Sequence, residues 1–216
     1  DSKFVEGLRV TDIDTVKVVE DVLANEINTE IVKSINDSGG NAIGLSGNIN
    51  RLISATQLKI EIKDSDSNIE KIVDIGFVGQ PTNVNIDLIN AHIQAGKIPV
   101  IAPLGVDDNE NSYNINADTA AGYIAAKLRA SKLLLLTDVA GVLDKDKNLI
   151  SSLTLDDAIK ITSEEFIVGG MKPKITTCIE AMKNGVNKST ILDGRIPHSV
   201  VLELFTEHGI GTQIYT

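Results

Sequence analysis

Residues 133–136 (Leu-Leu-Leu-Leu), followed directly by residues 137–142 (Thr-Asp-Val-Ala-Gly-Val), are the stretch of sequence that decides the fold. A short apolar run of this kind is typical of a strand buried on both faces, as helices covering a parallel sheet would bury it. Ligands of open α/β sheets bind at the carboxyl ends of the strands, so Thr137 and Asp138 are well placed to meet a nucleotide. Because Asp-x-x-Gly after a strand is also a frequent turn, an ordinary turn is the alternative.

Further apolar runs of the same character occupy residues 42–45, 98–104 and 190–192. Between the runs, apolar side chains recur at one-turn spacing, which predicts amphipathic helices with one face on a sheet. These side chains are Ile27, Ile31 and Ile35; Ile86, Ile89 and Ile93; and Ile175, Ile179 and Met182. The alternation of strand and helix favours a doubly wound α/β layer. Residues 59–76 are the exception, because their pattern around the polar residues 65–68 predicts an antiparallel hairpin.

The composition limits the classes of function. The 216 residues are 42% apolar, which fits one α/β domain or two lobes with a boundary near residues 103–114. The net charge of −10 argues against sequence-independent binding to nucleic acid or to an anionic membrane, so an anionic ligand needs a local cluster of positive charge. A single cysteine, Cys178, excludes an internal disulfide and a Cys-based zinc site. No apolar run is long enough for a membrane span, so we expect a soluble protein.

The most telling local feature is residues 169–174 (Gly-Gly-Met-Lys-Pro-Lys), at the start of a predicted helix. The first turn of a helix has unpaired N–H groups and a partial positive charge, so it usually contains Asp or Glu. Here Lys172 and Lys174 stand in that turn, after paired glycines that let a ligand approach the backbone. This pattern predicts an anion pocket reached by Lys174 or Lys172. The alternative is a flexible surface turn with solvated lysines.

Residues 114–118 (Asn-Ile-Asn-Ala-Asp) lead into another predicted helix. Asn114 and Asn116 alternate, so in an extended stretch both project to one side, beside the Asp118 carboxylate. Amides suit an uncharged polar group of a ligand, and the alternative is that these residues only cap the helix.

Residues 7–12 (Gly-Leu-Arg-Val-Thr-Asp) contain Arg9, ahead of a helix that we expect to begin at Thr11 or Asp12. The planar guanidinium of Arg9 suits a carboxylate. A solvated surface arginine is the alternative.

Taken in order, eight motifs of this sequence resemble those of the acetylglutamate kinases, within the amino-acid kinase family, along the whole chain. Besides residues 7–12, 114–118, 133–143 and 169–174, they are residues 44–47 (GLSG), 76–85 (GFVGQPTNVN), 98–105 (IPVIAPLG) and 193–212 (DGRIPHSVVLELFTEHGIGT). The resemblance implies a three-layer αβα sandwich with a mainly parallel central sheet. It divides the chain into an N-terminal amino-acid-substrate lobe (residues 1–105) and a C-terminal nucleotide-binding lobe (residues 106–216).

The resemblance also implies the reaction, which is ATP-dependent phosphorylation of the side-chain carboxylate of N-acetyl-L-glutamate, in arginine biosynthesis. Arg9 would bind the substrate α-carboxylate, and Asn114 with Asn116 would contact the acetylated amino acid. Asp118 would hold and orient catalytic lysines, and Lys174 would neutralise charge on the phosphoryl group while Mg²⁺ bridges the phosphates. The nucleotide would lie along Thr137, Asp138, Gly141, Val142, Leu143, Gly170, Met171 and Lys174.

Members of this family begin with a strand that carries a lysine and paired glycines, followed by a Gly-rich phosphate loop, and this sequence starts after both. We therefore expect residues 1–216 on their own to be inactive or nearly so, and the parent protein to be a kinase. Two other functions stay open. One is a kinase for another amino acid, and the other is a non-catalytic regulatory module that binds arginine or a signalling protein.

The C-terminal motif is similar to that of the arginine-inhibited, hexameric branch of the family. Glu203 is the candidate for binding the arginine guanidinium, and a solvated helix glutamate is the alternative. Members of that branch often have histidine where Thr190 stands here. The resemblance further implies a homo-oligomer, either a dimer or a hexamer of dimers, in the cytoplasm or plastid stroma. Some cyanobacterial and plastid members bind the PII signalling protein, which makes PII a candidate partner.

Overall fold

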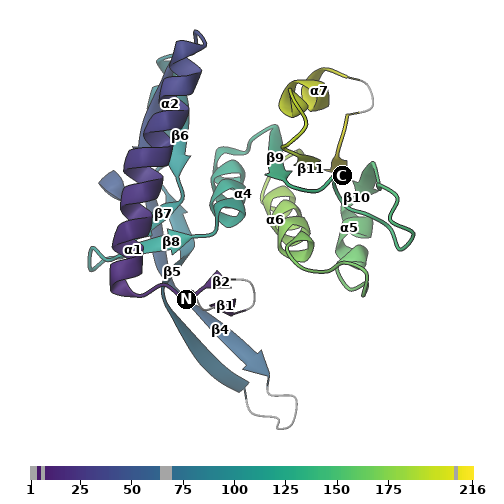
Figure 1. Cartoon of the computed structure of the whole chain (residues 1–216), viewed down its shortest axis with the longest axis horizontal. Coiled ribbons are helices and arrows are strands. Elements are labelled where there is room, and N and C mark those ends of the chain that lie inside the picture. Colours follow the sequence, from purple (N-terminus) through teal and green to yellow (C-terminus); the bar gives the residue numbers. More distant parts are fainter. Residues whose placement is uncertain (1–3, 6–7, 64–69, 207–208) are drawn as a thin grey trace. The chain divides into compact units, whose positions relative to one another are not determined.

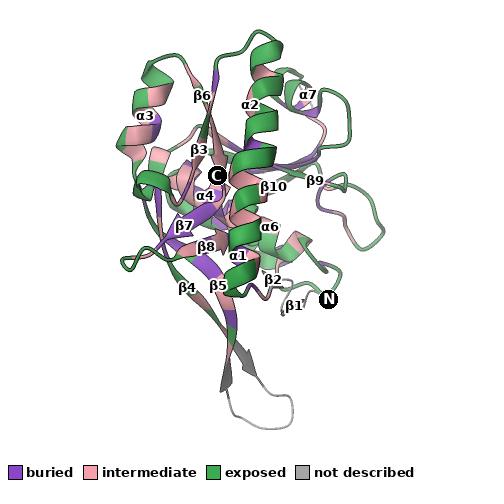
Figure 2. Cartoon of the chain, turned by 60° about the vertical axis from the view of Figure 1, so that its left-hand side comes forward, coloured by how far each residue is buried: buried purple, intermediate pink, exposed green. Residues whose placement is uncertain are grey.

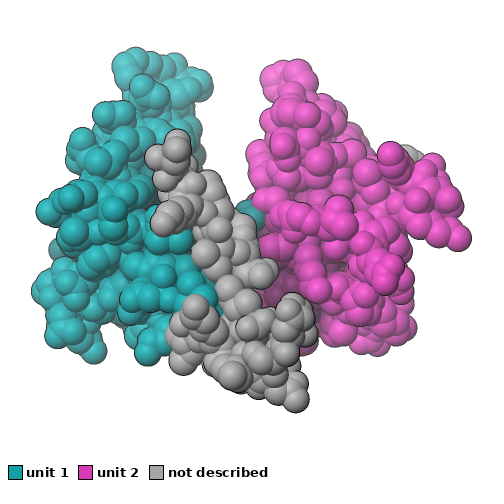
Figure 3. Space-filling model, turned by 60° about the horizontal axis from the view of Figure 1, so that its bottom comes forward, with its two compact units in different colours: residues 1–120 teal, residues 121–216 magenta. Residues whose placement is uncertain are grey.

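The computed structural model describes residues 4–5, 8–63, 70–206 and 209–216, with the backbone alone at residues 4–5, 8–9, 61–63 and 70–72. The chain forms two compact units, residues 1–120 and 121–216, which are coloured separately in Figure 3. Each unit has its own sheets and helices (Figure 1). None of the helices in the described ranges is long and apolar enough to cross a membrane.

The first unit contains a parallel pair of strands covered by helices. A continuous helical stretch contains α1 (Ile13–Glu20), the π-helical η1 (Asp21–Ile27) and α2 (Asn28–Asp37), and a separate helix is α3 (Ile86–Gln94). Strands β3 (Ala42–Ser46) and β6 (Ile98–Ala102) pair in parallel, and both α2 and α3 pack on the pair. Figure 2 shows these two helices on either side of it. The isoleucine spacing therefore predicts that these segments are helical, but it is wrong about the buried face. Ile27, Ile31 and Ile93 are 42%, 44% and 49% exposed, and the buried residues are Asn28 in α2 and Ile89 in α3.

A closed barrel of strands in the order β4-β5-β8-β7 completes the first unit. The strands are β4 (Ile53–Lys63), β5 (Glu70–Val84), β7 (Leu104–Val106) and β8 (Ser112–Ile115), with a short 3₁₀ helix, η2 (Ile49–Arg51), ahead of β4. Strands β4 and β5 are antiparallel, which confirms the predicted hairpin, although its turn lies outside the described residues. The barrel is tight, because a Cβ added to Gly79 would lie 2.6 Å from the Cβ of Tyr113.

The second unit is a four-stranded sheet in the order β10-β12-β11-β9. Its elements are α4 (Ala117–Leu128, which begins in the first unit), β9 (Lys132–Thr137), β10 (Ser152–Thr154), α5 (Leu155–Ile161), α6 (Met171–Lys183), β11 (Lys188–Asp193), α7 (Ser199–Phe205) and β12 (Thr212–Tyr215). Leu133, Leu135 and Ile191 pack into one core with residues of α6, including the fully buried Cys178. Thr190 points to the opposite face and bonds to α7 through Glu203. The sheet therefore lies between α6 and α7, as three layers require.

The predicted α/β class is confirmed, and the strand pairing is mixed. The pairs β3–β6, β9–β11 and β10–β12 are parallel, while β11–β12 and β4–β5 are antiparallel. The division between the units falls after Ala120, inside α4, whereas the lobes implied by the resemblance divide after residue 105. The reason is that β7 and β8 complete the barrel with β4 and β5, which keeps residues 104–115 in the first unit.

Replacing Ser189 by alanine is expected to stabilise the second unit. Ser189 is fully buried, and within the described ranges its hydroxyl has no hydrogen-bond partner. A buried hydroxyl without a partner costs desolvation energy, so its removal raises the free energy of unfolding by about 1 kcal/mol. Urea unfolding measures this change. The matched control is Thr190→Val, which is expected to destabilise because the Thr190 hydroxyl bonds to Glu203 at 3.1 Å. A destabilised Ser189→Ala variant would contradict the prediction.

Candidate active site

The first candidate cluster is the segment around Arg9, which docks on β5. Thr11 is fully buried, its N–H donates to the Ile75 carbonyl at 3.0 Å, and its carbonyl accepts from the Phe77 N–H at 2.7 Å. Between them, Gly76 has a φ of +76°, and a Cβ there would lie 2.1 Å from the Thr11 carbonyl oxygen, so only glycine fits. Arg9 belongs to the short strand β2 (Leu8–Arg9), which pairs with β1 (Phe4–Val5), and its side chain lies outside the described part of the chain.

The predicted alternation at residues 114–118 agrees with the observed burial. Ile115 is 1% exposed and faces the barrel interior, while Asn114 is half-buried and Asn116 is exposed. The Asn116 side-chain oxygen accepts from the Thr119 N–H at 3.1 Å, so Asn116 caps α4. Asp118 lies in the first turn of the same helix, where a carboxylate also complements the helix dipole.

The second candidate cluster is the carboxyl edge of the sheet in the second unit. Parallel strands β9 and β11 end together at Thr137 and Asp193, and the Gly194 N–H donates to the Thr137 carbonyl at 2.8 Å. Helix α6 packs on both strands and a short turn connects it to β11, so it runs antiparallel to β11. Its N-terminus therefore lies at this same edge. The topology thus brings Thr137 and the start of α6 to one edge, as parallel sheets with covering helices do.

The start of α6 has the features of an anion-binding turn. Gly170 precedes the helix, its first turn contains no acidic residue, and Lys172 is exposed while Lys174 is half-buried. Gly169 has a φ of +59°, in the region that favours glycine. A Cβ added to either glycine would meet nothing within 4 Å, so the space above this backbone is open. A cation beside open space suits a phosphate, and the backbone adds little to it, because the Met171 N–H donates to the Val168 carbonyl at 3.4 Å and Pro173 has no N–H.

Residues 141–143 are fixed by the last strand of the sheet. Thr212 accepts a hydrogen bond from the Val142 N–H at 2.8 Å, and a Cβ on Gly141 would lie 2.6 Å from the same hydroxyl. The Val142 side chain is fully buried in the core, and Leu143 forms a bridge with Leu149. Val142 is therefore used structurally, since its carbonyl also accepts from the Ile150 N–H at 2.9 Å.

Asp193 and Arg195 form an ion pair at the carboxyl edge, and the sequence did not identify either of them as a site residue. The Asp193 carboxylate accepts from Arg195 at its backbone N–H (2.9 Å), at Nε (2.9 Å) and at Nη2 (2.7 Å). These bonds from Arg195 lower the pKa of Asp193 to about 2, against the opposing effect of burial. The available signal was an Asp-x-Arg sequence directly after a strand that ends beside Thr137.

The low pKa of Asp193 predicts acid sensitivity. The folded-state pKa is about 2 and the ordinary value is 3.8, so the ionised carboxylate stabilises the fold above pH 3.8. This stabilisation is lost as the pH falls from 3.8 through about 2, because the folded state then has to take up a proton. Urea unfolding of the wild type and Asp193→Asn at about pH 6 and about pH 3 checks this, since the difference between them should shrink in acid. A difference that stays constant would contradict it.

Glu203 has a structural environment. Its side chain is 4% exposed, it accepts from the Thr190 hydroxyl and the Ile210 N–H, both at 3.1 Å, and Lys132 lies 3.9 Å away. The carboxylate therefore joins α7 to β11 and to the segment before β12. The alternative of a solvated helix glutamate is wrong, because the carboxylate is buried among its own partners. Arginine binding at Glu203 stays a prediction.

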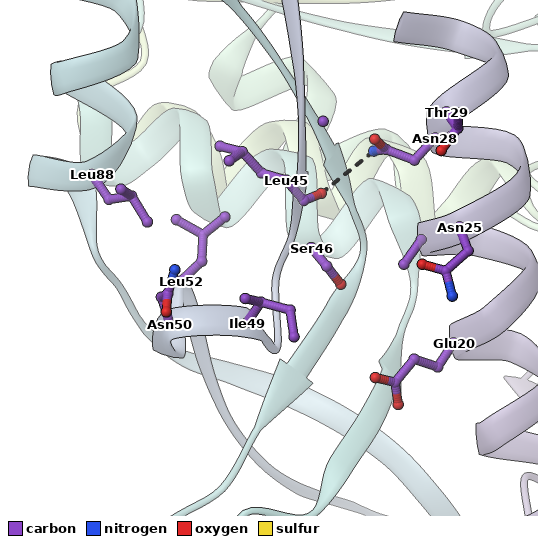
Figure 4. Close-up of a pocket in the computed structure, with 12 residues that line it drawn as sticks. Glu20, Asn25, Asn28, Thr29, Leu45, Ser46, Ile49, Asn50, Leu52 and Leu88 are labelled. Atoms are coloured by element: carbon purple, nitrogen blue, oxygen red, sulfur yellow. Dashed lines mark hydrogen bonds between the residues drawn. The ribbon is translucent and has the colours of Figure 1, made fainter.

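A cavity of about 420 Å³ in the first unit contains none of the predicted site residues. It lies between the α1–α2 helical stretch and β3, as Figure 4 shows. Asn28 is 6% exposed, and its side-chain amide donates to the carbonyls of Val100 at 2.9 Å and Leu45 at 3.4 Å. The polar Glu20 and Asn25 line the helical side of the cavity. Sequence reasoning gave no signal for it, because Asn28 stands in a helix whose isoleucines dominate the pattern.

A basic helix start at the carboxyl edge of an α/β sheet is typical of proteins that bind an anionic ligand such as a phosphate. The amino acid kinase family matches residues 1–193, and the chain belongs to this family. Among its relatives, the acetylglutamate kinase of Rhodospirillum centenum is 54% identical over 99% of this chain and 70% of the relative. The acetylglutamate kinase of Afipia carboxidovorans is 51% identical over 99% of this chain and 72% of the relative. The resemblance of the eight motifs is thereby confirmed.

Solved structures agree on the fold. N-acetylglutamate synthase from Neisseria gonorrhoeae, complexed with coenzyme A and N-acetyl-glutamate, matches with a TM-score of 0.83 at 25% identity. The match covers all of this chain and 47% of that chain. The fold is therefore shared with proteins of different activity, and the kinase function rests on the sequence relatives.

Proposed function

We propose that this protein transfers the γ-phosphoryl group of ATP to the side-chain carboxylate of N-acetyl-L-glutamate, forming an acyl phosphate in arginine biosynthesis. The observation that carries this proposal is the identity of 54% with an acetylglutamate kinase over 99% of the chain. The site also supports it, because the start of α6 carries two lysines and no acidic residue, next to open space above Gly169 and Gly170. ATP is the donor that a kinase of this family uses.

The two units take different substrates in this proposal. Arg9, Asn114 and Asn116 in the first unit bind the acetylated amino acid. Because the Asn116 oxygen caps α4, its amide nitrogen is the group left to donate to an oxygen of the ligand. The nucleotide lies along the carboxyl edge in the second unit, with its phosphates toward Lys174. The two functional lobes of this proposal are the two units, so the boundary between them falls after residue 120 and not after residue 105.

The reaction asks for charge neutralisation and alignment. An oxygen of the ionised acceptor carboxylate forms a bond to the γ-phosphorus while the bond from that phosphorus to the bridging oxygen of ADP breaks. No general base is required, because the acceptor is already ionised at neutral pH. Lys174 stabilises the charge on the transferring group, and Asp118 orients the cations of the site.

Mg²⁺ would enter the site with ATP and would reduce the electrostatic repulsion between the phosphates and the acceptor carboxylate. In the described part of the chain, no group of three or more His, Cys, Asp or Glu side chains is arranged to hold a metal ion. The proposal needs no such group, since Mg²⁺ typically keeps phosphate and water ligands with few protein carboxylates.

Trapping the acyl phosphate with hydroxylamine tests the proposal on the intact polypeptide. We expect hydroxamate that requires both ATP and N-acetylglutamate, with one ADP released for each hydroxamate. Preference for another acid, such as aspartate or aminoadipate, would favour a different kinase of the family. Binding of arginine or PII without nucleotide or N-acetylglutamate, measured by calorimetric titration, would favour a regulatory module. A cytoplasmic or plastid location, a homo-oligomer and PII binding stay predictions.

A further inference from the structure

Arg195 is held in a fixed orientation at the carboxyl edge of the sheet. Nε and Nη2 of its guanidinium donate to different oxygens of Asp193, at 2.9 and 2.7 Å, which fixes the plane of the group at two points. Asp193 is 10% exposed at its side chain, whereas the side chain of Arg195 is 67% exposed. The guanidinium is therefore a rigid, planar surface open to solvent, next to the end of β9 at Thr137.

The charges around the Arg195 guanidinium disfavour binding of the nucleotide's phosphate chain at this position. The pKa of Arg195 is raised, mainly by its bonds to Asp193 and to a smaller degree by the charge of Asp138, so Asp138 also acts on it. Two carboxylates and one guanidinium give this group a net negative charge. In the proposed function the phosphates are met by the lysines at the start of α6, in a first turn that contains no acidic residue. An uncharged part of the nucleotide is the better match for Arg195.

Apolar side chains next to these polar residues are exposed. Val139 is 39% exposed and Ile196 is 38% exposed, and each adjoins a polar residue of the edge in sequence. Large apolar side chains and a planar guanidinium both favour contact with the face of an aromatic ring. Carboxylates such as Asp138 accept hydrogen bonds from hydroxyl groups, as a ribose presents them.

We propose that Arg195, positioned by Asp193, packs against the base of the bound nucleotide and so holds its nucleoside end, while the phosphates extend toward α6. This inference rests on the proposed function, because it assumes that the carboxyl edge of the second unit binds ATP. It adds a residue that positions the donor for transfer.

Comparing a nucleotide with its phosphate chain alone tests the inference. The dissociation constants of ADP and of inorganic tripolyphosphate are measured by calorimetry for the intact polypeptide and its variants at one ionic strength. Arg195→Ala is expected to weaken ADP about ten-fold, the size of a stacked-base contact, and to leave tripolyphosphate within about two-fold. Arg195→Lys is expected to weaken ADP to a similar degree, because an ammonium group has no planar face. Asp193→Asn, which loosens the guanidinium, is expected to give a smaller loss of ADP affinity.

The ratio of the two affinities separates the outcomes. Equal weakening of ADP and tripolyphosphate by Arg195→Ala would show a phosphate contact or a general structural role, and would overturn the inference. Unchanged ADP binding would overturn it too. Lys183→Ala is the matched control, since it removes an exposed cation at the opposite end of α6 and should change neither ligand. Failure of the wild type to bind either ligand would instead refute the proposed function.

Discussion

Replacing Lys174 by alanine is expected to lower kcat by about 10²–10³-fold, the usual cost of losing one group that stabilises charge in a transition state. Lys174 is half-buried in the first turn of α6, where open space adjoins the glycine backbone. Charge on the phosphoryl group develops as its bond to ADP breaks, so a cation at this place acts most strongly in the transition state. The dissociation constant of N-acetylglutamate, which binds to the other unit in this proposal, is expected to change by less than about two-fold. Initial rates of ADP release and calorimetric titration measure the two quantities.

Lys172→Ala is the matched control for Lys174. Both lysines stand in the same helical turn, but Lys172 is exposed, and the sequence pattern alone left open which of them reaches the anion. We expect Lys172→Ala to lower kcat by less than about five-fold, the effect of one screened surface charge. If Lys172→Ala lowered kcat more than Lys174→Ala, Lys172 and not Lys174 would be the lysine that contacts the phosphoryl group. Equal and small losses would mean that this turn is a solvated surface feature.

Local patterns predict the parts of the fold that local forces determine. Isoleucines at one-turn spacing give α3 and α6, because one apolar face must be buried against a sheet. The leucine run gives β9, and Asp12 begins α1 by accepting from the Thr15 N–H at 2.7 Å, as expected for a helix cap. The closed barrel could not be predicted, because β7 and β8 reach β4 and β5 through pairings between residues far apart in the sequence.

The types of residue in the sequence predict where the candidate site is, but they do not predict what each residue contacts there. The paired glycines and lysines at residues 169–174 predict an open, basic helix start, since few other arrangements place cations there. Glu203 is a residue whose environment the sequence did not predict, because its burial depends on Thr190 and Ile210, which lie on other segments of the chain. The Asp193–Arg195 ion pair is a second feature that the sequence did not predict. A polar pair after a strand has an ordinary composition, and only the parallel alignment of β9 with β11 puts it beside Thr137.

Asp118→Asn is expected to lower kcat by about 10²-fold, the cost of misplacing a catalytic group by a small distance. The substitution keeps the shape of the side chain and removes its charge, so the electrostatic role that the proposed function gives to Asp118 is lost. A first-turn carboxylate also stabilises its helix through the dipole, by about 0.3–1 kcal/mol, and this purely structural role is the alternative. Activity and the free energy of unfolding must therefore be measured together.

Asp87→Asn separates these two roles, because Asp87 occupies the equivalent first turn of α3 and belongs to no proposed site. Both substitutions remove a carboxylate from a helix start, so both should lower the free energy of unfolding by a similar amount, less than about 1 kcal/mol. Only Asp118→Asn should lower kcat, and its effect should persist at saturating ATP and N-acetylglutamate, since the loss is in the transition state and not in binding. If the two variants have the same activity, Asp118 serves α4 alone, and the cations of the site are oriented by other residues.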